Sequence, residues 1–349
     1  MKRAFAIGIL GVVVAGTVVG AIACSSDSGG GGGPGGTDTG GVKLDTTPGT
    51  DGGTDTNVTP TDTAVSDSPG TDTGSDGGPI LPPACPTTLK DGKLAEFQDP
   101  ASAKKAALND GLHLTGVVAT SGKFLVSKSK TSGKCLYGVF VADANATFVP
   151  YSGILVVSQG NNAVAGETGT STFCTNGDLI PTDVKPGDVL ELKGTYDMFG
   201  PTSATCGGAS PPVPPPTPAK GAQLSNLCAY TKTGDGTAPA PAVVPPADLA
   251  GVAATAQWAG GLVKVTGVKT KTGLDGFGNF TLDPSGLQVG DTIYYRGAAT
   301  SPVMTAGKDL TEIVGLSYLD FCTWSLEPRS VCDIKPTPAV GDGGTATCP

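Results

Sequence analysis

Short apolar runs, each bounded by Gly, Pro, Asp or Asn, recur along the chain from about residue 112 onward. Val, Leu, Ile and aromatic residues dominate these runs, which is the composition of β-strands. The pattern predicts strands at residues 112–119, 124–127, 137–142, 154–157, 189–196, 262–268, 280–282, 293–296, 310–318 and 323–326. One helical window, 96–108, has good helix propensity but a thin apolar face. We therefore expect an all-β fold.

Three groups of residues recur in the same order in two parts of this region, which indicates an internal duplication. The matched groups are 115–117 with 266–268, 138–143 with 278–283, and 187–194 with 290–297, at offsets of 151, 140 and 103 residues. The falling offset places extra residues in the first copy, around Cys174. The Gly187-Asp188 and Gly290-Asp291 pairs are each expected to begin a strand.

The second copy resembles small OB-like β-barrel modules found in tandem in exported bacterial proteins, including the non-catalytic parts of some extracellular nucleases. The likeness lies in residues 258–265, 289–291, 318–321, 326–329 and Asp333, and in the Pro- and Val-rich join at 239–250. The resemblance implies two tandem OB-like barrels, at 85–233 with an insertion and at 251–335. A Pro-rich linker at 234–250 would join them, and a tail at 336–349 would follow. No catalytic nuclease domain accompanies the modules, which argues against a nuclease.

The first residues have a different pattern, typical of a signal peptide. Lys2 and Arg3 precede an apolar run at 4–22 that ends in Ala21-Ile22-Ala23-Cys24. This ending resembles the lipobox of bacterial lipoproteins, which implies cleavage after residue 23 and membrane attachment through lipid on Cys24. Ser25 implies sorting to the outer membrane by the same resemblance. An uncleaved anchor helix is the alternative, but four glycines within the run favour a processed signal.

Residues 24–84 consist almost wholly of Gly, Thr, Asp, Ser and Pro, so they predict a flexible spacer without a core. Nine aspartates against one lysine give the spacer a net charge of −8, the signal adds +2, and the rest of the chain carries −3 of the total −9. The body is therefore nearly neutral, without the basic footprint of a nucleic-acid binder. Residues 72–77 begin like a calcium-binding loop, but Pro83 stands where a bidentate glutamate is needed.

Eight cysteines follow Cys24, and in an oxidising compartment they predict up to four disulfides. They are Cys85, Cys135, Cys174, Cys206, Cys228, Cys322, Cys332 and Cys348. Both bodies hold an odd number, so unless two thiols stay free at least one bridge must cross between them, with Cys348 as the natural crossing partner. Six prolines within 211–218 predict a stiff loop, closed by a bridge between Cys206 and Cys228. No Cys-x-x-Cys pair supports zinc, and we expect neither a metal nor a cofactor.

The sequence offers little for catalysis. His113 is the one histidine, and we interpret it as an exposed or hydrogen-bonded strand residue and not as a general base. No Gly-x-Ser-x-Gly elbow is present, and Glu is scarce for a two-carboxylate glycosidase. We therefore expect a non-enzyme.

Aromatic residues beside cations in the second copy form a candidate ligand face, since OB barrels bind oligonucleotides or oligosaccharides on one face. The candidate residues are Tyr294, Tyr295, Arg296, Trp324 and Arg329. In the alternative interpretation Tyr295 and Trp324 fill the core and Arg329 pairs with a carboxylate such as Asp333. The favoured function is a tethered binding or structural lipoprotein of the cell envelope whose partner is an envelope protein or a glycan. An accessory single-stranded nucleic-acid binder is the alternative.

Overall fold

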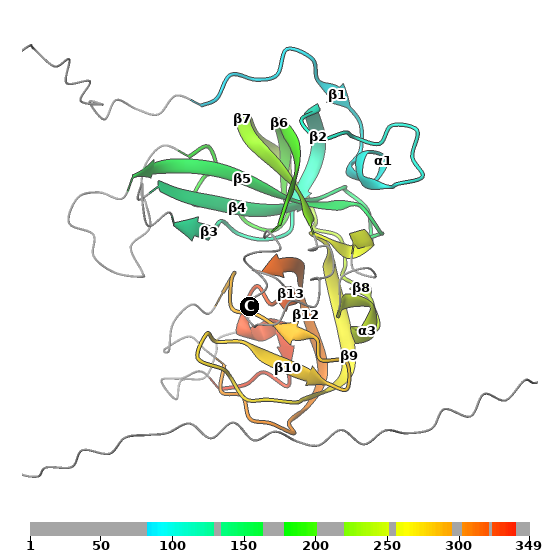
Figure 1. The fold of residues 1–349 in the computed structure, drawn as a ribbon, viewed down its shortest axis with the longest axis vertical. Coiled ribbons are helices and arrows are strands. Elements are labelled where there is room, and N and C mark those ends of the chain that lie inside the picture. The colour runs from blue at the N-terminus through cyan, green and yellow to red at the C-terminus, as the bar shows by residue number, and fades with distance from the viewer. Residues whose placement is uncertain are drawn as a thin grey trace, which may run out of the picture. The chain divides into compact units, whose positions relative to one another are not determined.

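The computed structural model describes residues 82–128, 134–162, 178–200, 220–250, 256–294, 302–320 and 323–339. The signal peptide, Cys24 and nearly all of the predicted spacer fall outside these ranges. The described chain is almost wholly β, with two seven-stranded sheets inside one compact unit, Thr73–Pro349 (Figure 1). The expected all-β fold of two tandem barrels is confirmed.

The first sheet closes on itself. Its strands are β1 (Lys90–Asp91), β2 (Gly111–Ala119), β3 (Phe124–Lys128), β4 (Lys134–Ala142), β5 (Gly153–Asn162), β6 (Asp188–Phe199) and β7 (Gly221–Asp235). Pairing runs β2-β6-β7-β5-β4, and a further β2–β4 pairing completes the ring. β5 and β7 are parallel, whereas the other ring pairs are antiparallel. This is the partly open, five-stranded Greek-key ring of an OB-like barrel.

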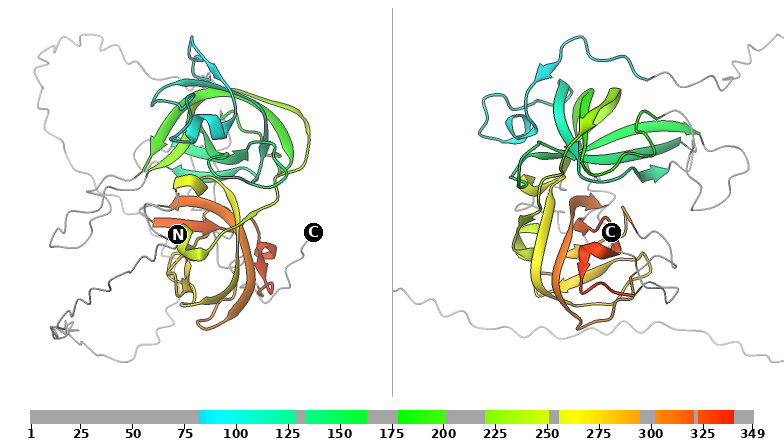
Figure 2. Two further views of the ribbon diagram at one scale, coloured as in Figure 1. Left: turned by 90° about the vertical axis from the view of Figure 1, so that its right-hand side faces the viewer. Right: turned by 180° about the vertical axis from the view of Figure 1, so that it is seen from behind.

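The second sheet repeats this ring. Its strands are β8 (Ala242–Val243), β9 (Leu262–Thr270), β10 (Phe280–Asp283), β11 (Gln288–Val289), β12 (Asp309–Asp320), β13 (Thr323–Glu327) and β14 (Ile334–Lys335). The ring order is β9-β12-β13-β11-β10, with β11 parallel to β13. Figure 2 shows β9 and β12 curving side by side through this barrel. β8 lies within the predicted linker and pairs with β9.

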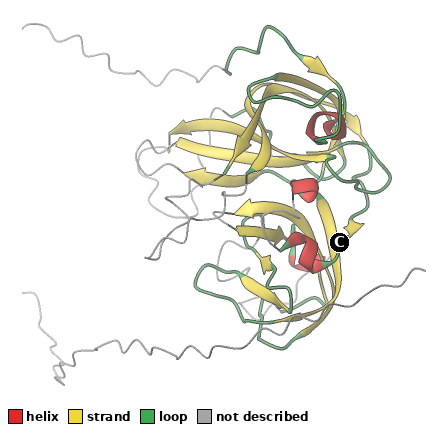
Figure 3. Ribbon diagram, turned by 45° about the vertical axis from the view of Figure 1, so that its right-hand side comes forward, coloured by secondary structure: helices red, strands yellow, loops and turns green. Residues whose placement is uncertain are grey.

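Helices are few and short among the described residues (Figure 3). They are α1 (Leu94–Gln98), α3 (Pro246–Leu249) and two single turns, Ala256–Trp258 and Val331–Asp333. The predicted helix at 96–108 was wrong in extent, because Pro100 disfavours helical backbone at Asp99 and α1 ends there. None of the described helices is long and apolar enough to cross a membrane.

The prediction also missed β7, and it placed a strand at 293–296 where Ile293 and Tyr294 form a bend. β7 alternates poorly because several of its positions are half-buried or exposed and carry Ser, Asn, Thr or Lys. Its place between β6 and β5 comes from tertiary pairing and not from a local apolar pattern. Tyr295 and Arg296 lie outside the described residues.

β2 and β9 are equivalent strands of the duplication. Their first seven positions have the same order of buried, half-buried and exposed residues at an offset of 151. In each strand a glycine with positive φ occupies the exposed position, Gly116 at 68° and Gly267 at 60°. In β2 this glycine lies at the register shift between Thr115 and Val117, where only a residue without Cβ adopts the bulge easily.

The other two sequence matches need correction. Ala119 pairs with Val141 and its equivalent Thr270 pairs with Leu282, so the second offset is 141 and not 140. The third match, Gly187 with Gly290, was wrong. The Gly187 N–H donates to Ala119 O at 2.9 Å, and the Gly307 N–H donates to Thr270 O at 2.8 Å. Gly307 is thus the true counterpart, and β12 is the equivalent of β6. Gly-Asp pairs are common turn residues, which explains the false match.

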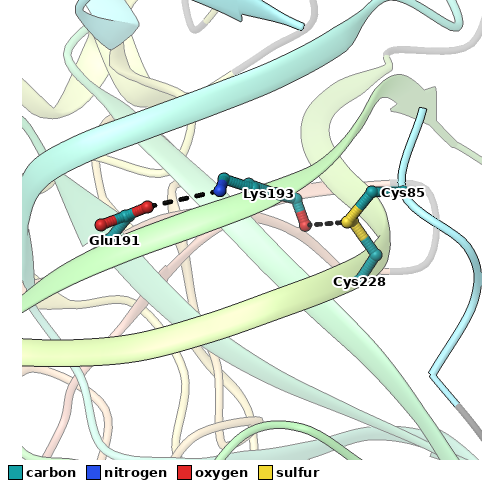
Figure 4. Close-up of a disulfide and its surroundings, with 4 residues drawn as sticks. All are labelled: Cys85, Glu191, Lys193 and Cys228. Carbon is teal, nitrogen blue, oxygen red and sulfur yellow. Dashed lines mark hydrogen bonds and ion pairs between the residues drawn. A yellow bond between two sulfur atoms is a disulfide. The ribbon is translucent and has the colours of Figure 1, made fainter. Parts of the chain in front are cut away.

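A disulfide between Cys85 and Cys228 joins the N-terminal end of the described chain to β7, across 143 residues of sequence. Figure 4 shows Cys228 Sγ close to the carbonyl of Lys193, at 3.4 Å. This is a contact and not a hydrogen bond, since a bridged sulfur carries no hydrogen. The expected Cys206–Cys228 bridge was therefore wrong. Cys135 and Cys332 are also disulfide-bonded, while Cys174, Cys206, Cys322 and Cys348 lie outside the described residues.

Candidate ligand-binding face

In an OB-like barrel the second and third ring strands and the adjoining loops form the usual ligand face. In the first barrel these strands are β4 and β5. The odd-numbered side chains of β4 from Cys135 to Val141 point into the barrel core. The opposite face is apolar and belongs to a separate cluster, which joins Phe140, Leu155 and Val157 to Val314, Leu316 and Tyr318 of β12. The second barrel therefore covers the ligand face of the first.

Aromatic rings form the centre of this contact. Phe124 and Phe140 stack with ring centroids 5.5 Å apart. Tyr318 meets both rings edge to face, at 6.5 Å and 5.8 Å. Edge-to-face geometry adds to the gain from burial alone, because the positive ring edge meets a negative face.

The two copies have diverged at the positions that make this contact. Gly194 pairs with Leu112 and Gly315 pairs with the equivalent Val263, which aligns β6 with β12. The outward residues of β12, Val314, Leu316 and Tyr318, then correspond to Lys193, Thr195 and Asp197 of β6. The apolar stripe that docks the second barrel is thus absent from the equivalent strand of the first.

The ligand face of the second barrel is different, because it is polar and hollowed. Phe140 and Leu155 pair across β4 and β5, and at the equivalent positions Thr281 and Gln288 pair across β10 and β11. A pocket of about 560 Å³ opens here. It is lined by Asp275, Phe277, Asn279, Gln288, Asp291, Asp320 and Thr323. Three of these residues carry carboxylates, and no Lys or Arg of the described residues lines the pocket. We call it the acidic pocket.

The loop before β10 holds one wall of the acidic pocket. Asp275 Oδ1 accepts hydrogen bonds from the N–H groups of Phe277 and Asn279, at 2.8 Å and 2.9 Å. This tight turn leaves Phe277 82% exposed. Gly278 follows at φ 90°, and a Cβ there would approach a carboxylate oxygen of Asp291 to 2.8 Å. The Gly276-Phe277-Gly278 turn therefore presents an apolar ring beside the aspartates.

A fully buried carboxyl lies beside this pocket. Glu327 at the end of β13 is 0% exposed. Ser325 Oγ lies 2.5 Å from its Oε1, and the Thr292 N–H donates to Oε2 at 2.8 Å. Burial raises the pKa of Glu327 to about 7, and the nearby charges of Asp320 and Asp291 act in the same direction. A protonated Glu327 donates to Ser325 Oγ, which in turn donates to Tyr318 O, so every polar atom of the carboxyl has a partner.

The residues of the candidate face predicted from sequence do not come together around this pocket. Trp324 is 3% exposed and packs with Ala259 and Leu319, so its ring offers no stacking surface. Arg329 forms a two-point ion pair with Asp333, with Nη2–Oδ1 at 3.0 Å and Nε–Oδ2 at 3.2 Å. Tyr294 is half-buried, and Tyr295 and Arg296 lie outside the described residues. The residues that line the acidic pocket were not identified from the sequence. The one sequence signal that could have indicated them is the aromatic Phe277 between two glycines.

His113 lies in β2, and both of its ring nitrogens are within hydrogen-bond distance of a carboxylate. Its Nδ1 lies 2.6 Å from Asp91 Oδ1 and its Nε2 lies 2.9 Å from Glu191 Oε1. The carboxylates are on opposite sides of the ring, so they do not converge on one ion. No group of three or more His, Cys, Asp or Glu within the described ranges is arranged to hold a metal ion.

Comparison of the chain with family models, with curated proteins and with solved structures finds no match. The likeness between the two barrels themselves is therefore the comparison on which the assignment of the ligand face rests.

Proposed function

We propose that this chain is a lipoprotein of the cell envelope, held by lipid on Cys24, whose second barrel binds a partner through the acidic pocket. The lipobox-like ending of the signal segment and Ser25 support attachment to the outer membrane. The low-complexity composition of residues 24–84 supports a spacer between the anchor and the barrels. The function is binding, without a catalytic step.

One observation carries the proposal. The same barrel face is apolar and covered in the first copy, but among the described residues it is polar and hollowed in the second. In such a duplication, the first barrel contributes the face that packs against the second barrel. The second barrel keeps its pocket for a partner. The first barrel then acts as the support for the second.

The chemistry of the pocket favours a positively charged partner. Asp275 supplies a carboxylate to the pocket wall, and the exposed ring of Phe277 offers both apolar contact and a cation–π surface. A Lys or Arg side chain on an envelope protein combines an apolar stem with a charged end, so it matches both features. The Asp275 carboxylate opposes phosphate, which counts against the nucleic-acid alternative.

A binding experiment with the full chain tests the proposal. With Cys24→Ser to avoid the lipid, isothermal titration should detect binding of a pentalysine peptide at low salt, and weaker binding of pentaglutamate or oligothymidylate. Phe277→Ala should weaken pentalysine binding about threefold, as expected for one cation–π contact. Phe199→Ala is the matched control, since that ring is 52% exposed on the first barrel.

Two results would contradict the proposal. The first is pentalysine binding that is unchanged by both Phe277→Ala and Asp275→Asn. The second is tighter binding of oligothymidylate than of pentalysine, which would favour the nucleic-acid alternative instead.

A further inference from the structure

A second pocket, of about 350 Å³, lies on the first barrel at the ends of β6 and β7. Its polar and sulfur-bearing lining consists of Gln98, Lys105, Tyr151, Tyr196, Met198 and Lys220. Small and apolar residues from the α1–β2 connection, β7 and the 256–259 turn complete the wall. We call this the lysine pocket. In OB-like barrels these strand ends lead into the connection between the fourth and fifth ring strands, which belongs to the usual ligand face.

The charge of this pocket is opposite to that of the acidic pocket. Lys105 and Lys220 are its charged lining residues, and no Asp or Glu lines it among the described residues. Elsewhere several lysines of the barrels form ion pairs with carboxylates, as Lys90 does with Asp110 at 2.6 Å and Lys232 with Asp188 at 2.7 Å. Neither Lys105 nor Lys220 forms an ion pair within the described chain. Two uncompensated cations thus border one cavity.

Hydrogen bonds fix the walls of the lysine pocket in place. The Ala106 N–H donates to Phe97 O at 2.9 Å, and the Asn109 N–H donates to Tyr196 O at 2.9 Å. These bonds hold the connection that carries Lys105 against β6. Gln98 Nε2 donates to Tyr151 O at 2.9 Å and to Gly153 O at 2.7 Å. A preformed pocket costs less ordering entropy on binding than a mobile one.

The interior of the lysine pocket is amphipathic. Leu108 is 56% exposed at its rim, so its side chain is available for apolar contact with a ligand. Tyr196 is 7% exposed, and its hydroxyl donates only to the thioether of Met198, at 3.6 Å. A thioether is a weak acceptor, so the phenol gains from turning to a ligand oxygen. We infer that this pocket binds a small amphipathic anion, with its charged group between Lys105 and Lys220 and its apolar part against Leu108.

Matched fluorescent probes test this inference on the full chain. Anilinonaphthalene sulfonate has an aromatic body and one negative charge, whereas N-phenyl-1-naphthylamine is neutral and of similar shape. The sulfonate should bind more tightly than the neutral probe. The double variant Lys105→Ala/Lys220→Ala should weaken sulfonate binding about tenfold, since two partly exposed ion pairs are lost. Its control, Lys185→Ala/Lys271→Ala, changes the net charge equally at exposed sites away from the pocket.

Displacement identifies the preferred chemistry. Dodecanoate and dodecyl phosphate should displace the sulfonate probe, and dodecanol should displace it much less. The inference is overturned if dodecanol competes as well as dodecanoate, or if both double variants weaken the sulfonate equally. Because the two pockets share no lining residue, either can fail these tests without affecting the other.

Discussion

Phe140 of the first barrel and Tyr318 of the second meet edge to face, with ring centroids 5.8 Å apart and planes at 82°. Both side chains are buried, and each comes from the outward face of its own barrel. This contact covers the β4–β5 face of the first barrel and leaves the equivalent β10–β11 face of the second barrel outside the contact.

Loss of the Tyr318 ring should therefore destabilise the pair of barrels. Tyr318→Ala is expected to lower the free energy of unfolding by about 3 kcal/mol, because a buried aromatic is lost and a cavity remains. Urea denaturation followed by circular dichroism measures this change. Phe277→Ala removes an exposed ring and should change stability by less than about 0.5 kcal/mol. Equal effects of the two variants would contradict the assignment of Tyr318 to the contact.

Glu327 should make stability depend on pH. Its pKa is about 7 in the folded chain, above the value near 4.5 of an unperturbed glutamate, so the folded state holds a proton that the unfolded state releases. The stabilisation is fully present below pH about 4.5 and is lost as the pH rises through 7, with an upper limit on the order of 3 kcal/mol.

Urea denaturation between pH 5 and 8 checks this dependence, with Glu327→Gln as the test variant. An uncharged amide at this position should remove the decline in stability between about pH 5 and 8. Glu312→Gln changes a half-exposed glutamate on the outer face of β12, and it should leave the decline in place. The same pH profile in wild type and Glu327→Gln would show that Glu327 is not the titrating group.

The Cys85–Cys228 bridge closes a loop of 143 residues, so it should contribute strongly to stability. Replacement of both cysteines by serine is expected to lower the free energy of unfolding by about 4 kcal/mol, since the unfolded chain regains the entropy of the open loop. Denaturation of this variant beside wild type, both without reductant, gives the difference. A loss below about 1 kcal/mol would mean that strain or residual structure offsets the constraint.

Cys24→Ser tests the anchor. The variant should move from the membrane fraction to the soluble fraction of cells, because a lipid chain supplies the membrane affinity. Ser26→Ala, two residues further on, should leave the protein in the membrane fraction. Density separation of the membranes then checks the outer-membrane assignment. Retention of Cys24→Ser in the membrane fraction would favour the anchor-helix alternative.

The strands that the sequence predicts well are those with a local signature. β2 and β9 combine an apolar run with a glycine of positive φ, so both the strand and the duplication are visible without a structure. β7 could not be found in this way, because its polar residues are positioned by neighbours distant in sequence. Gly187 was matched to the wrong glycine because a turn residue carries no information about its strand partner.

The site could not be predicted for a related reason. The packing of one barrel on the other determines which face is covered. That packing depends on three apolar residues of β12, Val314, Leu316 and Tyr318, whose counterparts in β6 are Lys193, Thr195 and Asp197. Their difference is visible only after the two strands are aligned by their hydrogen-bond partners. Trp324 and Arg329 looked suited to a ligand, but the indole is buried in a core cluster and the guanidinium is held in an ion pair.

The position of Cys85 has a mechanical consequence if Cys24 is the anchor. Tension along the tether would reach the fold first at Cys85, before the short edge strand β1, which pairs with β2 over only Lys90 and Asp91. The disulfide passes that force directly to β7, which is hydrogen-bonded to β6 along most of its length. Because the covalent bond carries the force past β1, β1 would not be separated from β2 when the tether is stretched. The barrels would therefore stay folded under tension.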